Sequence, residues 1–207
     1  MCKGCLVTTT PPRPRIDGRT ARRDRNRDAV MDAVIELFTE GLIPPSAPEV
    51  AERSGISLRS VYRYFDDNDD LITTAIGRHV ERNEPLFELN TDTSDPLGSR
   101  IERLVDARLT LYTAVADTVR VSIMRSGDLP IIAEQLAVRR RQMRDQTAEM
   151  FAPELAALDD ATAAEVLGAV DALTQFEAPE HLGATGQMSL PEIRSTLVGA
   201  LSRLLSA

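Results

Sequence analysis

The chain has few of the residue types on which enzymes, metal sites and disulfide-bonded folds depend. Its 207 residues include no tryptophan, two histidines and two cysteines. Cys2 and Cys5 form one isolated pair, whereas a structural zinc site needs about four ligands. The histidines lie far apart, and no glycine-rich phosphate-binding loop is present. We therefore expect no catalytic residues, no metal and no cofactor, and we interpret the cysteines as incidental thiols of a tail.

Long apolar runs are also absent. No segment approaches the roughly 20 apolar residues that cross a bilayer, and the first residues lack the apolar core of a signal peptide. We expect a cytoplasmic protein without a membrane partner. A chain of this length can bury a sizeable core without disulfides or metals.

The negative charge is unevenly distributed along the chain. The formal net charge is −8, yet residues 1–65 contain eleven Lys or Arg against eight Asp or Glu, a net of +3. The remaining 142 residues therefore carry −11. Because the local field decides which surface approaches a polyanion, the basic N-terminal part can face DNA while the acidic part faces away.

Residues 46–65 carry the signals of two short helices joined by a tight turn. Ser46 can accept from the backbone N–H three residues on, while Glu49 can accept from the Ser46 N–H. Gly55 can take the positive φ that ends a helix, and Ser57 can cap the next one. This spacing predicts a helix-turn-helix.

The second of these helices has two unlike sides. A helical wheel puts Leu58, Val61, Tyr62 and Phe65 on a packing side and Arg59, Ser60, Arg63 and Tyr64 on an exposed side. Guanidinium groups can bond guanine edges, and hydroxyls can bond phosphate. An ordinary surface helix is the alternative, but the caps, the turn and the two-sided pattern together favour DNA recognition. The candidate DNA-binding residues are Ser46, Ser57, Leu58, Arg59, Ser60, Tyr62, Arg63 and Tyr64.

The run from Val50 to Ser57, with Val61 to Phe65 and Leu71, resembles the DNA-binding region of tetracycline-repressor (TetR) family regulators. The resemblance implies an all-helical homodimer that binds a palindromic operator in double-stranded DNA and often binds a small effector in its C-terminal domain. One position departs from the family pattern. Asn68, within the acidic run 66–70, stands where the family usually has a lysine. An expected phosphate contact is therefore missing.

We expect three parts along the chain. Residues 1–20 form a disordered basic arm, which either enters an adjacent minor groove or is a solvated leader. Residues 21–85 form the three-helix DNA-binding domain, whose first helix runs from about Arg22 to Glu40. Residues 86–207 form a helical domain for effector binding and dimerisation.

Helices are expected throughout the C-terminal part, so the predicted fold class is all-α. One starts at Asp95 and Pro96 and either continues or breaks near Ala116. The others are expected from Pro130 to about Pro153, over 159–176 and over 189–205. The helix expected from Pro130 carries a cluster of arginines, which is interpreted as a solvated face. Its members are Arg139, Arg140, Arg141 and Arg144.

Arg108 falls in the middle of an apolar helix face. A guanidinium is rarely buried unless it is paired. In one interpretation Arg108 forms a structural ion pair, with Glu177 as the candidate partner because it also falls on an apolar face. In the other, Arg108 and Tyr112 face a cavity and bind an acidic or polar effector.

The last two helices can either seal the core of a monomer or, paired across a two-fold axis, form a four-helix interface. The first is rich in alanine and glycine, which permit close helix approach, and the second carries an apolar stripe. Because one short recognition helix makes few base contacts, two must be held about 34 Å apart, which requires a dimer. We therefore expect a homodimer, and the resemblance implies that it is a ligand-responsive repressor. The alternatives are a helical DNA-binding or interaction module without effector control, and an enzyme with an accessory DNA-binding module.

Overall fold

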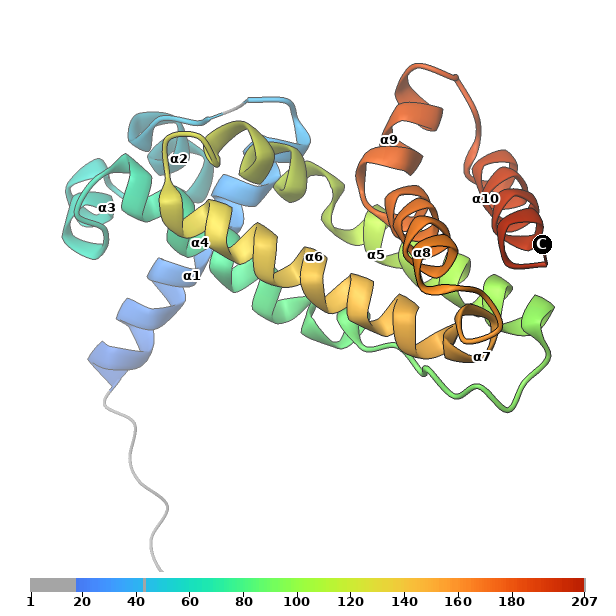
Figure 1. Ribbon diagram of the computed structural model, residues 1–207. Helices are drawn as coiled ribbons and strands as arrows, with labels where there is room; N and C mark the ends of the chain where they lie inside the picture. The colour runs from blue at the N-terminus through green and yellow to red at the C-terminus, as the bar shows by residue number, and fades with distance from the viewer. Residues whose placement is uncertain (1–17, 43, 207) are drawn as a thin grey trace, which may run out of the picture.

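The computed structural model describes residues 18–42 and 44–206, which fold into helices without any strand (Figure 1). This confirms the predicted all-α class. The expectations for Cys2, Cys5 and most of the basic arm concern residues outside the described part. The elements are α1 (Gly18–Thr39), α2 (Ala47–Ser54), α3 (Leu58–Tyr64), α4 (Asn68–Arg82), a 3₁₀ turn η1 (Glu84–Phe87), α5 (Leu97–Arg125), α6 (Pro130–Met150), α7 (Ala152–Leu155), α8 (Asp160–Thr174), α9 (Glu177–Ala184) and α10 (Leu190–Leu205).

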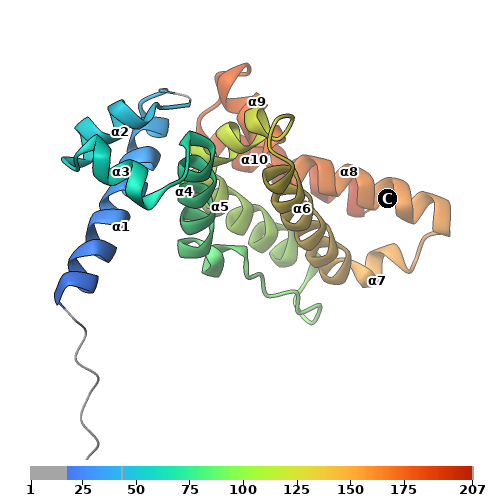
Figure 2. The same cartoon turned by 90° about the vertical axis from the view of Figure 1, so that its left-hand side faces the viewer.

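The first helix begins earlier than its apolar stripe indicates. The stripe starts at Val30, whereas α1 already begins at Gly18, so the last three residues of the expected arm, 18–20, are helical. The N-terminal turns of α1 extend away from the other helices in both views (Figures 1 and 2). They carry arginines and few apolar residues.

The core of the helix-turn-helix part also includes side chains from the C-terminal helices. Residues of α1 to α4 pack together, with Val30, Val50 and Ile72 fully enclosed. Val121 near the end of α5 and Ile132 near the start of α6 belong to the same core. The helix-turn-helix part, α1 to α4, is therefore fixed to the body by apolar packing, in addition to the chain connection through α4 and η1.

A second core lies at the other end of the molecule. The N-terminal half of α5 packs with α6, α7, α8 and α10 around Leu104, Met150 and Leu201. Figure 1 shows α2 and α3 at one end and α8 and α10 at the other, with α5 and α6 between them. Within residues 18–42 and 44–206, no helix is long and apolar enough to cross a membrane.

One expectation for the C-terminal helices was wrong: the sequence predicts no helix over 177–188, but α9 lies there. The helix expected over 159–176 ends at Thr174, because Gln175 takes an extended conformation (φ −77°, ψ 166°) that turns the chain away. Between the two outcomes left open at Ala116, α5 continues without a break from Leu97 to Arg125.

Candidate functional site

Both ends of α2 have the predicted features, a capping pair at its start and a glycine with positive φ at its end. Glu49 accepts hydrogen bonds from the backbone N–H of Ser46 (2.8 Å) and from its hydroxyl (2.6 Å), which hold the pKa of the Glu49 carboxyl below its usual value. Gly55 ends α2 with φ 67°, a conformation that costs glycine little. Three residues then separate α2 from α3. Ser46 before α2 and Ser57 before α3 are both exposed.

The packing side of α3 is narrower than the helical wheel indicates. Val61 and Phe65 are buried, but Leu58 and Tyr62 are 37% and 56% exposed, so their assignment to the packing side was wrong. Tyr64, expected on the exposed side, is half-buried against the core of the helix-turn-helix part. This seven-residue helix is held by Val61, by Phe65 at its C-terminal end and by part of Tyr64, and most of its other side chains are exposed.

The exposed surface of α3 presents two arginines without carboxylate partners among the described residues. Arg59 is exposed and makes no ion pair in the described part of the chain. Arg63 donates through Nη2 to the hydroxyl of Tyr64 (3.1 Å), and its guanidinium lies 5.1 Å from the centre of that ring. Ser57 and Ser60 share a hydrogen bond of 3.0 Å beside them.

Other arginines of the same part are neutralised. Arg53 pairs with Glu40 (2.5 Å between Nη2 and Oε2), and Arg78 pairs with Asp32 (2.6 Å between Nη1 and Oδ1). The hydrogen bond with Glu40 raises the pKa of Arg53. Burial alone would raise the pKa of Asp32, but the hydrogen bonds from Arg78 and Arg82 lower it below its usual value. The surface of α3 therefore retains positive charge that is available to an anion.

The acidic run after α3 is used within the fold. Asp67 caps α4 by accepting from the Asp70 N–H (2.8 Å), Asp70 accepts from the Asp66 N–H (3.0 Å), and Asp69 pairs with Arg125 (2.6 Å). Carboxylates are stabilising at a helix N-terminus. Asn68 donates through Nδ2 to the carbonyl oxygen of Pro45 (3.2 Å), which ties the start of α4 to the α1–α2 connection.

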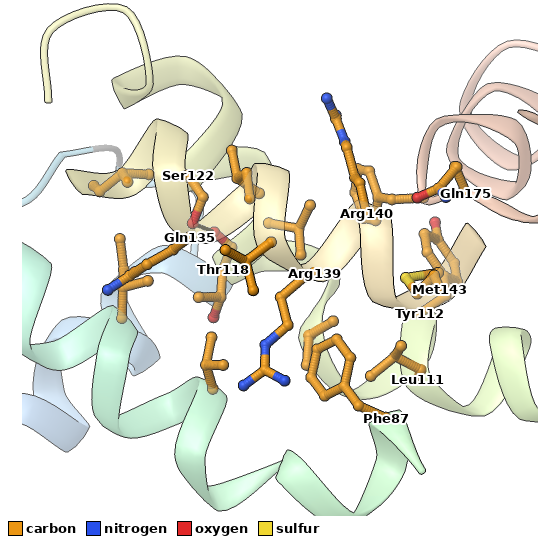
Figure 3. A pocket seen from close by; sticks show the side chains of 18 of the residues that line it. Phe87, Leu111, Tyr112, Thr118, Ser122, Gln135, Arg139, Arg140, Met143 and Gln175 are labelled. Atoms are coloured by element: carbon orange, nitrogen blue, oxygen red, sulfur yellow. Dashed lines mark hydrogen bonds between the residues drawn. The ribbon is translucent and has the colours of Figure 1, made fainter. Parts of the chain in front are cut away.

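A cavity of about 590 Å³ lies between α4, α5, α6 and the α8–α9 junction (Figure 3). Its wall is mostly apolar, with Leu111 and Val115 of α5 and Phe87 of η1 among the buried side chains. Ile76, Gly77 and Val80 of α4 also line it. The helix that directly follows α3 is therefore part of the wall.

Arg108 lies in the inner wall of this cavity and is only 5% exposed. It donates to Oε1 of Gln146 (3.1 Å) and to the carbonyl oxygen of Met143 (2.9 Å). Burial lowers its pKa to about 10, partly offset by the charge of Asp171. The proposed pairing with Glu177 was wrong, because Glu177 begins α9 and pairs with Arg140 instead.

Tyr112 also lines the cavity and is held by a cluster that the sequence did not reveal. Its hydroxyl donates to Oε2 of Glu180 (2.8 Å), and burial and this carboxylate both raise the pKa of the phenol. Glu180 in turn pairs with Arg120 (2.6 Å between Oε1 and Nε). The sequence pattern does not indicate that residues 112, 120 and 180 meet, because Glu180 is brought to the other two by α9, which was not predicted.

The arginine cluster of α6 is not a free basic face. Arg139 pairs with Glu84, and its guanidinium carbon lies 4.6 Å from the centre of the Phe87 ring. Figure 3 shows the side chains of Arg139 and Phe87 close together. Arg140 pairs with Glu177, and Arg144 lies 3.2 Å from Asp171. Three of its four arginines thus join α6 to other elements. Among residues 18–42 and 44–206, no group of His, Cys, Asp and Glu side chains has the arrangement of a metal site.

Two parts thus define the molecule: a helix-turn-helix whose second helix is open to solvent, and a helical body that encloses a cavity. Proteins of known structure have a similar fold. A TetR-family transcriptional regulator from Streptomyces coelicolor has a similar structure, with a TM-score of 0.65 and 19% identity over 87% of this chain and 80% of that one. The multidrug binding protein EbrR, solved with imidazole, is similar with a TM-score of 0.55 and 17% identity over 86% of this chain and 94% of that one.

In sequence, the chain is similar to the HTH-type transcriptional repressor LfrR of Mycolicibacterium smegmatis. The two are 29% identical over 92 residues, which are 43% of this chain and 47% of LfrR, so the match spans about half of that relative. No protein-family model matches the chain. The chain has the fold of the TetR family, and the resemblance found in its helix-turn-helix residues is confirmed.

Proposed function

We propose that the chain is a DNA-binding transcriptional repressor that acts in the cytoplasm, binds a palindromic operator as a homodimer and is released by a small-molecule effector. The observation that carries the proposal is the exposed surface of α3, where Arg59 and Arg63 have no carboxylate partner in the described part of the chain. A helix of this kind fits the major groove, where arginine can bond both acceptors of a guanine edge. Leu58 and Tyr62, being exposed, add apolar surface for a thymine methyl group.

The proposed contacts divide into two kinds. Arg59, Arg63, Leu58 and Tyr62 face outward and would read base edges. The hydroxyls of Ser46, Ser57, Ser60 and Tyr64 would bond backbone phosphates and fix the docking angle. The arm of residues 1–20 would add further phosphate or minor-groove contacts, and the helical start of α1 at Gly18 would direct it.

Dimerisation is proposed through α8 and α10. Alanines 161, 164 and 172 of α8 are exposed, and Leu190 at the start of α10 is 45% exposed. Small exposed residues allow two helices to approach closely, and a two-fold pairing of α8 and α10 would make a four-helix interface. The two recognition helices would then lie on one face of the DNA.

Effector control is proposed because the cavity shares a wall with the DNA-binding part. Side chains of α4 line it, and α4 directly follows the recognition helix. An effector that binds better to a conformation whose α3 helices do not fit the operator must weaken operator binding by the same factor. Two similar proteins agree with effector control of a repressor: LfrR is named a transcriptional repressor, and EbrR is named a multidrug binding protein. A module without effector control would have no need of a cavity of this size.

The experiment begins with footprinting on DNA that flanks the gene of this protein. A protected palindrome, bound by two chains per site in sedimentation analysis, is the expected result. Repeating the footprint with candidate metabolites should reveal compounds that remove the protection. A protein that binds all DNA equally would contradict the operator proposal, and protection by a single chain would contradict the dimer.

The arm is tested separately by removing residues 1–17, which precede α1. If the arm contacts DNA, operator affinity falls and its dependence on salt becomes less steep, because fewer phosphate charges are neutralised. An unchanged affinity and salt dependence would show that these residues are only a solvated leader.

A further inference from the structure

The cavity contains one buried cation whose charge is not matched. Both terminal nitrogens of Arg108 bond neutral acceptors, the Gln146 side chain and the Met143 carbonyl. Its Nε is buried and has no hydrogen-bond partner among the described residues. The carboxylate that acts on it electrostatically, Asp171, is itself bonded to Arg144 and Gln175. A buried charge without a close counter-ion is costly, and a bound anion would relieve that cost.

The other charged groups of the wall differ in position or in pairing. Arg139 and Arg140 pair with Glu84 and Glu177. Glu81 and Glu134 are exposed, so they lie at the mouth of the cavity between α4 and α6. Positive charge at the inner end and negative charge at the mouth would orient a ligand that carries one anionic group.

The remaining wall fits an apolar ligand body. Figure 3 shows Leu111 and Phe87 beside Tyr112 and Met143, with the hydroxyls of Thr118 and Ser122 farther along α5. The volume of about 590 Å³ lies within the roughly 300–1,000 Å³ of small-molecule sites. Ile131 and Val138, both close to half exposed, continue the apolar surface to the mouth.

We infer that the cavity takes an amphiphilic anion, with its carboxylate or equivalent group against Arg108 and its apolar body extending toward α4. This inference rests on the proposed function, since it names the chemical class of the effector. The anion would compete with Gln146 for the guanidinium. Gln146 also donates to the carbonyl oxygen of Phe87 (2.7 Å), so its release would reach η1 and, through η1, α4.

The test compares three ten-carbon probes of one shape and different charge: decanoate, decanol and decylammonium. Their binding to the full chain is measured by titration calorimetry at pH 7 and below their micellar concentrations. We expect decanoate to bind at least about tenfold more tightly than decanol, because a charge-assisted hydrogen bond to Arg108 replaces a neutral one. Decylammonium should bind most weakly.

Two variants assign the preference to the guanidinium. Arg108→Met should bring decanoate to the affinity of decanol while leaving decanol binding intact, which also shows that the cavity has formed. Gln146→Glu keeps Arg108 and places a carboxylate against it, so it should also remove the preference. Arg140→Met is the matched control, because this arginine also lines the cavity but is already paired with Glu177. The Arg140→Met variant should still bind decanoate more tightly than decanol.

The outcomes separate the inference from the proposed function. Decanol or decylammonium binding as tightly as decanoate to the unmodified chain overturns the inference and leaves effector control standing. The inference also fails if Gln146→Glu still binds decanoate more tightly than decanol. This second variant keeps the test decisive if Arg108→Met does not fold. If none of the three probes binds, the inference fails, while effector control and operator binding are decided separately by the footprint with candidate metabolites.

Discussion

Asp69 and Arg125 join the first turn of α4 to the last turn of α5 through an ion pair of 2.6 Å between Oδ1 and Nη2. Asp69 lies only five residues after the end of α3. The pair therefore connects the body of the protein to the segment that immediately follows α3. It adds to the apolar contact between Val121 of α5 and the core of α1 to α4.

Asp69→Asn should lower the free energy of unfolding by less than about 1 kcal/mol, because half of the Asp69 side chain is exposed and its charge is screened. Urea denaturation of the full chain measures the change. Asp66→Asn serves as the control, since the Asp66 side chain makes no ion pair within the described residues. A loss of more than about 2 kcal/mol would mean that this contact holds the two parts together to a greater extent than its exposure allows.

Arg59→Ala and Arg63→Ala should each weaken operator binding by about 1–3 kcal/mol while affecting random DNA much less, because base contacts supply selectivity. Fluorescence anisotropy with operator and shuffled duplexes measures both affinities. Arg53→Ala is the control, as this arginine of α2 is paired with Glu40 at the end of α1. An equal loss on both duplexes would indicate that the two arginines contact phosphates only.

Asn68→Lys should strengthen binding to operator and random DNA alike, since it adds a cation near the phosphate backbone. The structure adds a cost: the hydrogen bond to the Pro45 carbonyl is lost, which should reduce the free energy of unfolding by about 0.5–1.5 kcal/mol. Anisotropy and urea denaturation give the two quantities. A gain confined to operator DNA, or no gain, would count against a missing phosphate contact at this position.

Glu154→Ala should lower the free energy of unfolding by about 3 kcal/mol, because Arg100 is buried and would lose its counter-ion. Glu154 receives two bonds from Arg100, of 2.9 and 2.5 Å. Asp95→Ala provides the comparison, since it removes a similar pair with Arg103 whose carboxylate is half exposed, and it should cost less than about 1 kcal/mol.

The same pair predicts acid sensitivity. The hydrogen bonds from Arg100 hold the pKa of Glu154 below its ordinary value of 4.5 in the folded chain. Its contribution is therefore present above that ordinary value and is lost as the pH falls through the lowered pKa. The difference in stability between the unmodified chain and Glu154→Ala should shrink below about pH 4, as measured by urea titrations at several pH values.

The helix starts could be predicted because their determinants are local. Ser46 with Glu49, Asp67 and Ser189 with Glu192 each mark a helix start, and all three begin helices in the structure. Capping depends on side chains within three residues of one another, so it can be recognised without knowing the fold.

Properties that depend on how helices dock could be predicted only in part. The wheel correctly marked Arg108 as buried, but its partner depended on where α8 ends. Gln175 redirects the chain there and moves Glu177 to Arg140. Likewise, the exposure of Leu58 and Tyr62 depended on the angle at which α3 meets α1, which no periodicity within seven residues specifies.

The unbroken course of α5 has a mechanical consequence. At 1.5 Å per residue, its 29 residues form a rod of about 43 Å. One end is embedded beside α10, the middle lines the cavity, and the other end enters the core that α1 to α4 form. A tilt of about 5° around its first turn would displace its last turn by about 4 Å, roughly the spacing of neighbouring base pairs.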